Sequence, residues 1–174
     1  MEETGRTGFT LIELLVTVAV LALLGGIAVP AMSHFVDNGR LRGAAEQLLQ
    51  DLRQARSRAL TVQEDVYVAF AAPAAKTWCY GWHERDACDC RVPDGCAASP
   101  GGTARARSGN DFPGITLNTP RYSPAYTLHF AALRGTADAA TFRLSGRTGE
   151  IRVIVSPLGR VRTCAPSVPG FSPC

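Results

Sequence analysis

The hydrophobic residues near the start of the chain form one continuous run. Residues 9–29 (FTLIELLVTVAVLALLGGIAV) are almost entirely apolar, and Glu13 is the single charged residue among them. At the helical rise of ~1.5 Å per residue, this run can cross the roughly 30 Å hydrocarbon core of a bilayer. We therefore predict a transmembrane helix over residues 9–30. A cleaved secretory signal is the alternative, but the run exceeds the usual ~7–15 apolar residues and no strongly basic segment precedes it.

Beyond residue 31 the hydrophobic residues recur at intervals of four and three, which is one face of an amphipathic helix. This face consists of Leu41, Ala45, Leu48, Leu52, Ala55 and Ala59. The other faces carry arginines that we expect to be solvated: Arg40, Arg42, Arg53, Arg56 and Arg58. The two patterns together predict one long helix from about Phe9 to Leu60. Residues 31–62 would be its amphipathic continuation, packed against a domain.

After residue 62 the pattern changes to short runs that are rich in β-branched and aromatic residues and are bounded by Gly or Pro. These runs predict strands at 65–71, 77–83, 115–118, 126–131, 141–145 and 150–156. Residues 84–113 have no periodicity and are expected to form a loop-like, cysteine-rich insertion. The predicted fold class is α+β, with a long N-terminal helix against mostly antiparallel β-sheets formed by residues 63–174.

The cysteines indicate the compartment of this domain. All of them follow the apolar run, and an even number in a short exported domain suggests disulfides: Cys79, Cys88, Cys90, Cys96, Cys164 and Cys174. Their spacing lacks the paired hooks of a zinc site, so no metal is expected. Cys88 and Cys90 are too close to bridge each other without strain, and Cys164 could pair with Cys174 to close the proline-rich tail. We therefore expect residues 31–174 in the oxidising periplasm.

No group of residues points to catalysis. The three histidines, His34, His83 and His129, are scattered, and each is expected to be a packing or surface residue. The sequence lacks the motifs of serine hydrolases, zinc proteases and phosphate-binding loops. We expect neither an enzyme nor a cofactor.

Charge does add a candidate site. The 18 basic residues are 17 Arg and a single Lys, and residues 101–174 carry a net charge of +6. Such a field favours polyanions such as nucleic acid or anionic lipid, although an ordinary basic surface is the alternative. If residues 160–164 are extended, Arg160 and Arg162 point to the same side, about 7 Å apart. Two guanidiniums can then bind neighbouring phosphates, unless they only protect an edge strand. Further candidates on charge alone are Arg105, Arg107, Arg147 and Arg152.

The N-terminus resembles a known processing motif. Gly8, Phe9, Glu13 and Pro30 stand at the spacing found in type IV pilins and type II secretion pseudopilins, although this leader has two Glu and one Arg instead of a basic character. The resemblance implies that prepilin peptidase removes residues 1–8 and that the new amino group of Phe9 is methylated. It also implies that Glu13 pairs with that amino group of a neighbouring subunit during assembly. Pro30 has no N–H and would loosen the helix after the span.

The rest of the chain extends the resemblance. Residues 41–70 and 149–164 are similar to the FimT/GspH class of pseudopilins, and Gly159-Arg160-Val161-Arg162 resembles a motif of FimT-type minor pilins. That motif implies sequence-independent DNA binding by Arg160 and Arg162, presented by a turn at Gly159, in DNA uptake for natural transformation. A GspH-like structural or priming role in type II secretion or pilus assembly is the alternative. The implied partners are DNA, major and minor pilins, prepilin peptidase and the inner membrane, with the soluble domain in the periplasm or the pilus fibre.

Overall fold

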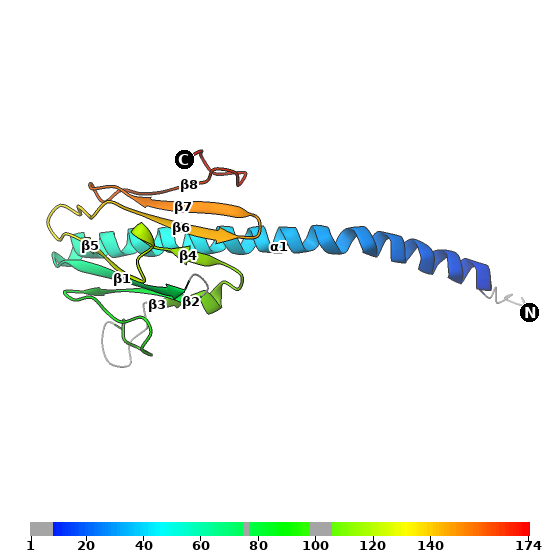
Figure 1. Ribbon diagram of the computed structural model, residues 1–174, viewed down its shortest axis with the longest axis horizontal. Helices are drawn as coiled ribbons and strands as arrows, with labels where there is room; N and C mark the ends of the chain where they lie inside the picture. Colours follow the sequence, from blue (N-terminus) through cyan, green and yellow to red (C-terminus); the bar gives the residue numbers. More distant parts are fainter. Residues whose placement is uncertain (1–8, 75–76, 98–105) are drawn as a thin grey trace, which may run out of the picture. The chain divides into compact units, whose positions relative to one another are not determined.

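The computed structural model describes residues 9–74, 77–97 and 106–174, and the side chains of all of these except residues 27–31. The chain divides into two compact units, residues 1–36 and 37–174, each of which is described separately. Helix α1 (Leu11–Val62) runs through both units, which confirms the predicted long helix (Figure 1). Helical structure continues through position 30.

The first unit is the N-terminal part of α1. The backbone N–H of Glu13 lies 3.4 Å from the hydroxyl of Thr10, the residue that precedes the helix, and Glu13 occupies the first turn, where a negative charge complements the helix dipole. Large apolar side chains between Phe9 and Leu24 are exposed. Within the described residues, no helix combines the length and the apolar character needed to cross a membrane. The transmembrane segment stays a prediction.

The second unit contains two four-stranded antiparallel sheets beside the C-terminal half of α1 (Figure 1). The first sheet has the order β3-β2-β1-β5 and is built from β1 (Val66–Ala74), β2 (Thr77–Glu84), β3 (Ala106–Ser108) and β5 (Ala125–Phe130). The second has the order β4-β6-β7-β8 and is built from β4 (Thr116–Asn118), β6 (Ala140–Gly146), β7 (Gly149–Val155) and β8 (Val161–Cys164). Two short 3₁₀ helices flank β4, at Gly109–Asp111 and Pro120–Tyr122.

All six predicted strands are present, and β8 covers residues 161–164 of the extended segment expected at residues 160–164, which leaves Arg160 in the preceding turn. The prediction for residues 84–113 was wrong at one point, because β3 lies within this supposed loop. β3 is only three residues long and pairs with the edge of β2, with Cys79 opposite Ser108. A strand this short has too few residues to produce an alternating pattern, so its formation depends on pairing with β2.

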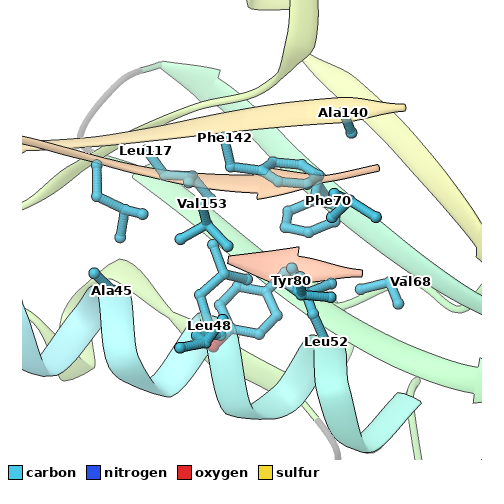
Figure 2. Close-up of a cluster of buried hydrophobic side chains, with 14 of the residues drawn as sticks. Ala45, Leu48, Leu52, Val68, Phe70, Tyr80, Leu117, Ala140, Phe142 and Val153 are labelled. Atoms are coloured by element: carbon cyan, nitrogen blue, oxygen red, sulfur yellow. The ribbon is translucent and has the colours of Figure 1, made fainter. Parts of the chain in front are cut away.

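The core lies between the helix and the two sheets. Figure 2 shows side chains of α1, such as Leu48 and Leu52, in one buried cluster with Phe70 of the first sheet and Phe142 of the second. The rings of Phe70 and Phe142 are stacked with their centroids 4.2 Å apart, so they join the two sheets directly. The hydroxyl of buried Tyr80 donates a hydrogen bond to Asp51 Oδ2 at 2.8 Å. Burial, together with the charge of Asp51, raises the pKa of Tyr80.

Disulfides join all six cysteines, as expected. Cys79 of β2 pairs with Cys90 and so ties the insertion to the sheet, whereas the Cys88–Cys96 bridge closes a loop within the insertion. The third bridge, Cys164–Cys174, closes the proline-rich tail after β8. The tail returns to the helix, where the Arg42 guanidinium donates to the carbonyl of Pro169.

Candidate nucleic-acid interface

The turn between β7 and β8 positions the two arginines of the Gly-Arg-Val-Arg motif. The N–H of Gly159 donates to Ser156 O at 2.8 Å, and the N–H of Ser156 donates to Arg160 O at 3.0 Å. The Ser156 hydroxyl also accepts the backbone N–H of Arg160 at 3.1 Å. Gly159 adopts φ of +70°, a conformation that residues with a side chain rarely take. These bonds make the turn a defined structure in which Arg160 has one backbone position.

The side chains of the motif alternate between a buried and an exposed side as the chain enters β8. Val161 is 5% exposed and belongs to the core, whereas Arg160 and Arg162 on either side of it are exposed. β8 is the edge strand of its sheet, so no further strand of the described chain covers it. Among the described residues, neither guanidinium forms an ion pair with a carboxylate. Each therefore keeps a planar set of N–H donors available for an anion.

Helix α1 supports this turn through an arginine that was expected to lie on a solvated face. Arg56 donates from Nε to Gly135 O at 3.2 Å and from Nη2 to Leu158 O at 3.1 Å. The solvated interpretation was therefore wrong for Arg56, which joins the helix to the β5–β6 and β7–β8 loops. Arg53, one turn earlier, points to the same region, with its Nη2 3.4 Å from Val161 O. The only sequence signal for the pair was their i, i+3 spacing, which places both on one side of a helix.

Glycine at position 159 also permits a close approach between these two loops. A Cβ built at Gly159 would lie 1.8 Å from Gly135 O and 2.9 Å from Arg56 Nε. No side chain fits in this space without moving backbone atoms. The glycine of the motif thus serves the turn and the contact between loops at once.

The other arginines proposed from charge are dispersed. Arg152 lies on β7 on the same sheet face as Arg162, since Arg162 is opposite Ile154 in the register, but Arg152 Nε is 2.6 Å from Glu150 Oε1. Arg147 lies in the β6–β7 hairpin, at the other end of β7 from Gly159, and its Nη1 is 3.4 Å from Asp37 Oδ2. Of the described arginines proposed from charge alone, Arg152 shares a sheet face with Arg162.

Arg107 belongs to β3 in the other sheet, where its Nε lies 3.8 Å from Asp51 Oδ2. Arg105 and Gly8 lie outside the described residues, as does the side chain of Pro30. Phe9 and Glu13 are exposed on the first unit. The proposed cleavage, methylation and assembly roles of these N-terminal residues stay predictions.

Two titratable groups outside the arginine motif, Asp65 and His129, interact with each other. His129 Nε2 lies 3.1 Å from Asp65 Oδ2, and the imidazole stacks on Tyr67 with ring centroids 5.1 Å apart. The backbone N–H of Ala132, with a smaller contribution from His129, holds the pKa of Asp65 below its ordinary value. Within the described parts of the chain, no three His, Cys, Asp or Glu residues are grouped so as to hold a metal ion.

Comparison with known proteins identifies the family. The family model of Type II transport protein GspH matches residues 44–159, and the model of the prokaryotic N-terminal methylation motif matches residues 4–29. No curated protein sequence matches the chain.

Two solved structures share the fold. The type IV minor pilin FimU of Pseudomonas aeruginosa has 22% sequence identity and a TM-score of 0.51, covering 79% of this chain and 98% of FimU. The minor pseudopilin EpsH from the type 2 secretion system of Vibrio cholerae has 15% identity and a TM-score of 0.51, covering 74% of this chain and 98% of EpsH. Since the GspH match spans more than half of the sequence, the chain belongs to the GspH family of type IV pilins and pseudopilins.

Proposed function

We propose that this chain is a minor type IV pilin that binds DNA without sequence specificity during DNA uptake for natural transformation. The observation that carries the proposal is the pair of exposed arginines at the start of edge strand β8, with Arg160 in the turn just before the strand and Arg162 on it. Neither guanidinium has a carboxylate partner among the described residues. Each guanidinium can donate a forked pair of hydrogen bonds to a phosphate. Contacts of this kind recognise the DNA backbone, not the bases, and weaken as salt rises.

The N-terminal unit would hold the subunit in the inner membrane and later in the fibre. Its exposed apolar side chains between Phe9 and Leu24 support this role, because such a surface is stable only when lipid or other apolar helices cover it. Prepilin peptidase would cleave after Gly8, and the new Phe9 amine would be methylated. The Glu13 carboxylate would pair with the Phe9 amine of a neighbouring pilin, since burying both charges together costs less than burying either alone.

The soluble domain would lie in the periplasm before assembly. Its three disulfides support an oxidising compartment. Its partners would be major and minor pilins along the fibre and DNA at the arginines. A single domain with a few phosphate contacts binds DNA weakly, so several copies in one fibre would raise the apparent affinity.

The test is DNA binding by the full chain, oxidised and in a non-ionic detergent, to a fluorescent duplex over a range of salt concentrations. Arg160→Ala/Arg162→Ala should lower the salt slope by about 2 and weaken binding roughly 10- to 100-fold at low salt. The matched control is Arg85→Ala/Arg91→Ala, which removes the same charge from two exposed arginines that have carboxylate partners. The control should change affinity by less than about threefold, because a carboxylate of the protein already pairs with each of its guanidiniums.

A structural role in a secretion pseudopilus is the second candidate. It is favoured by the position of Arg162 on an edge strand and of Arg160 directly before it, where charged side chains also prevent unwanted strand pairing. Failure of the wild-type chain to bind duplex DNA at low salt, with its disulfides intact, would reject the DNA-uptake proposal and support this alternative. An equal loss of binding in the double variant and in the control would also reject the assigned site.

A further inference from the structure

A pocket opens next to the Gly-Arg-Val-Arg turn, between this turn and helix α1. Its volume is about 380 Å³, which leaves room for an anion and several waters. The polar side chains that line it are Arg53, Arg56, Ser57 and Arg160, and no carboxylate lines it. Three arginines therefore line one space, and no acidic side chain among the lining residues balances their charge.

The donors of these side chains are only partly used within the protein. A guanidinium has five N–H donors, and Arg56 uses Nε and Nη2 for the carbonyls of Gly135 and Leu158, which leaves Nη1 available. The bond from Arg53 to Val161 O is long at 3.4 Å. Ser57 adds a hydroxyl at the pocket. The pocket thus offers several N–H and O–H donors to a ligand.

Two other arginines of the same helix are paired with carboxylates. Arg58 has its Nε 2.8 Å from Glu84 Oε1, and Arg40 Nη1 lies 3.8 Å from Asp37 Oδ1. Arg53 and Arg56 have no such carboxylate within the described residues. Like charges held close together repel one another, and a bound anion relieves that repulsion while it accepts the free donors.

We propose that this pocket binds a phosphate group of the DNA backbone, so that the DNA interface extends from β8 onto helix α1. The proposal rests on the DNA-binding function proposed above, and it adds residues from a separate element to that site. Arg53 and Arg160 contact the phosphate oxygens from the two sides of the pocket. Arg56 contributes charge and holds the β7–β8 turn in place, which makes it a positioning residue. Continuity with Arg162 favours a polymer of phosphates over an isolated anion.

The first test measures duplex binding by the full chain in non-ionic detergent with Arg53→Gln and with Arg58→Gln as the matched control. Both variants remove one charge from an exposed position of α1. We expect Arg53→Gln to weaken binding roughly 10-fold at about 50 mM salt and to lower the salt slope by about 1. Arg58→Gln should change affinity by less than about twofold and leave the slope unchanged.

A second variant separates positioning from charge. Arg56→Lys keeps the positive charge but cannot bridge two carbonyls with a rigid fork. It should accelerate amide hydrogen exchange at Gly159 and Arg160 in the absence of DNA, and it should weaken duplex binding without changing the salt slope. Unchanged exchange at these amides would overturn the positioning role of Arg56.

The outcomes distinguish this proposal from the proposed function. If Arg160→Ala/Arg162→Ala abolishes binding while Arg53→Gln behaves like Arg58→Gln, the pocket assignment is wrong and the DNA-binding function stands. If the wild-type chain binds no duplex at low salt, both are wrong. Inorganic phosphate provides a further readout: it should shift the amide resonances of Gly159 and Arg160 in the wild type and not in Arg53→Gln. Stronger competition by an acidic peptide than by an oligonucleotide would overturn the DNA assignment in favour of a protein partner.

Discussion

Replacing Gly159 by alanine tests how the arginine-bearing turn is built. In the native structure Gly159 has φ of +70° and packs against the backbone of the β5–β6 loop. The added Cβ would lie 1.8 Å from Gly135 O, so the two loops must separate by more than ~1 Å to reach a normal contact. That movement would pull the Gly135 carbonyl away from Arg56 Nε, which donates to it at 3.2 Å.

The expected magnitude has two parts. A non-glycine residue in the left-handed region costs about 1–2 kcal/mol. Loss of a hydrogen bond from a charged donor costs roughly 1.5–3 kcal/mol more. Gly159→Ala should therefore lower the free energy of unfolding by about 2.5–5 kcal/mol. Gly114→Ala is the matched control, because Gly114 has φ of +85° and a Cβ added there would have no neighbouring atom within 4 Å. The control should lose only the conformational part, about 1–2 kcal/mol.

The assay is urea unfolding of the oxidised full chain in non-ionic detergent, followed by tryptophan fluorescence. Both tryptophans, Trp78 and Trp82, are buried in β2, so the signal reports on the unit of residues 37–174. The reasoning is refuted if Gly159→Ala and Gly114→Ala destabilise the domain equally. An equal loss would mean that the β5–β6 loop can move away from Gly159 without lowering the free energy of unfolding. The contact between the loops would then not stabilise the turn.

Two further predictions concern the tail and the acid side of the stability profile. The variant Cys164→Ser/Cys174→Ser should lower the free energy of unfolding by about 2–3 kcal/mol, because the bridge closes a short loop in the unfolded chain, and an unchanged urea midpoint would contradict this. The pKa of Asp65 is held below its ordinary value by the N–H of Ala132 and by His129, so its contribution to stability is present above about pH 4 and is lost as the pH falls through its lowered pKa. Asp65→Asn should therefore show a shallower loss of stability on acidification than the wild type, and identical acid profiles in circular dichroism would count against it.

Local features of the chain were predictable from the sequence. The helix of residues 11–62 and the six strands follow from hydrophobic periods that depend only on neighbouring residues. The alternation of Arg160, Val161 and Arg162 was predictable for the same reason, since successive side chains of a strand point to opposite faces. The even number of cysteines indicated disulfides, and the N-terminal motif and the Gly-Arg-Val-Arg segment indicated the family.

Contacts between distant segments could not be predicted from such local sequence patterns. The strand order in two sheets, the three-residue strand β3 and the pairing of Cys79 with Cys90 each depend on which segments meet after the chain collapses. The missed role of Arg56 has the same origin, because its acceptors Gly135 and Leu158 are 79 and 102 residues away in sequence.

The sequence by itself therefore determined the elements, the family motif and the exposed arginine pair, because each is encoded by residues within a few positions of one another. Only the tertiary structure decided what lies beside that pair. It placed Arg53 and Arg56 across a pocket from Arg160, and it made Gly159 necessary through the approach of Gly135. Hydrogen bonds and close contacts across long sequence separations form only when burial of a shared core brings their partners together, and no local pattern records them.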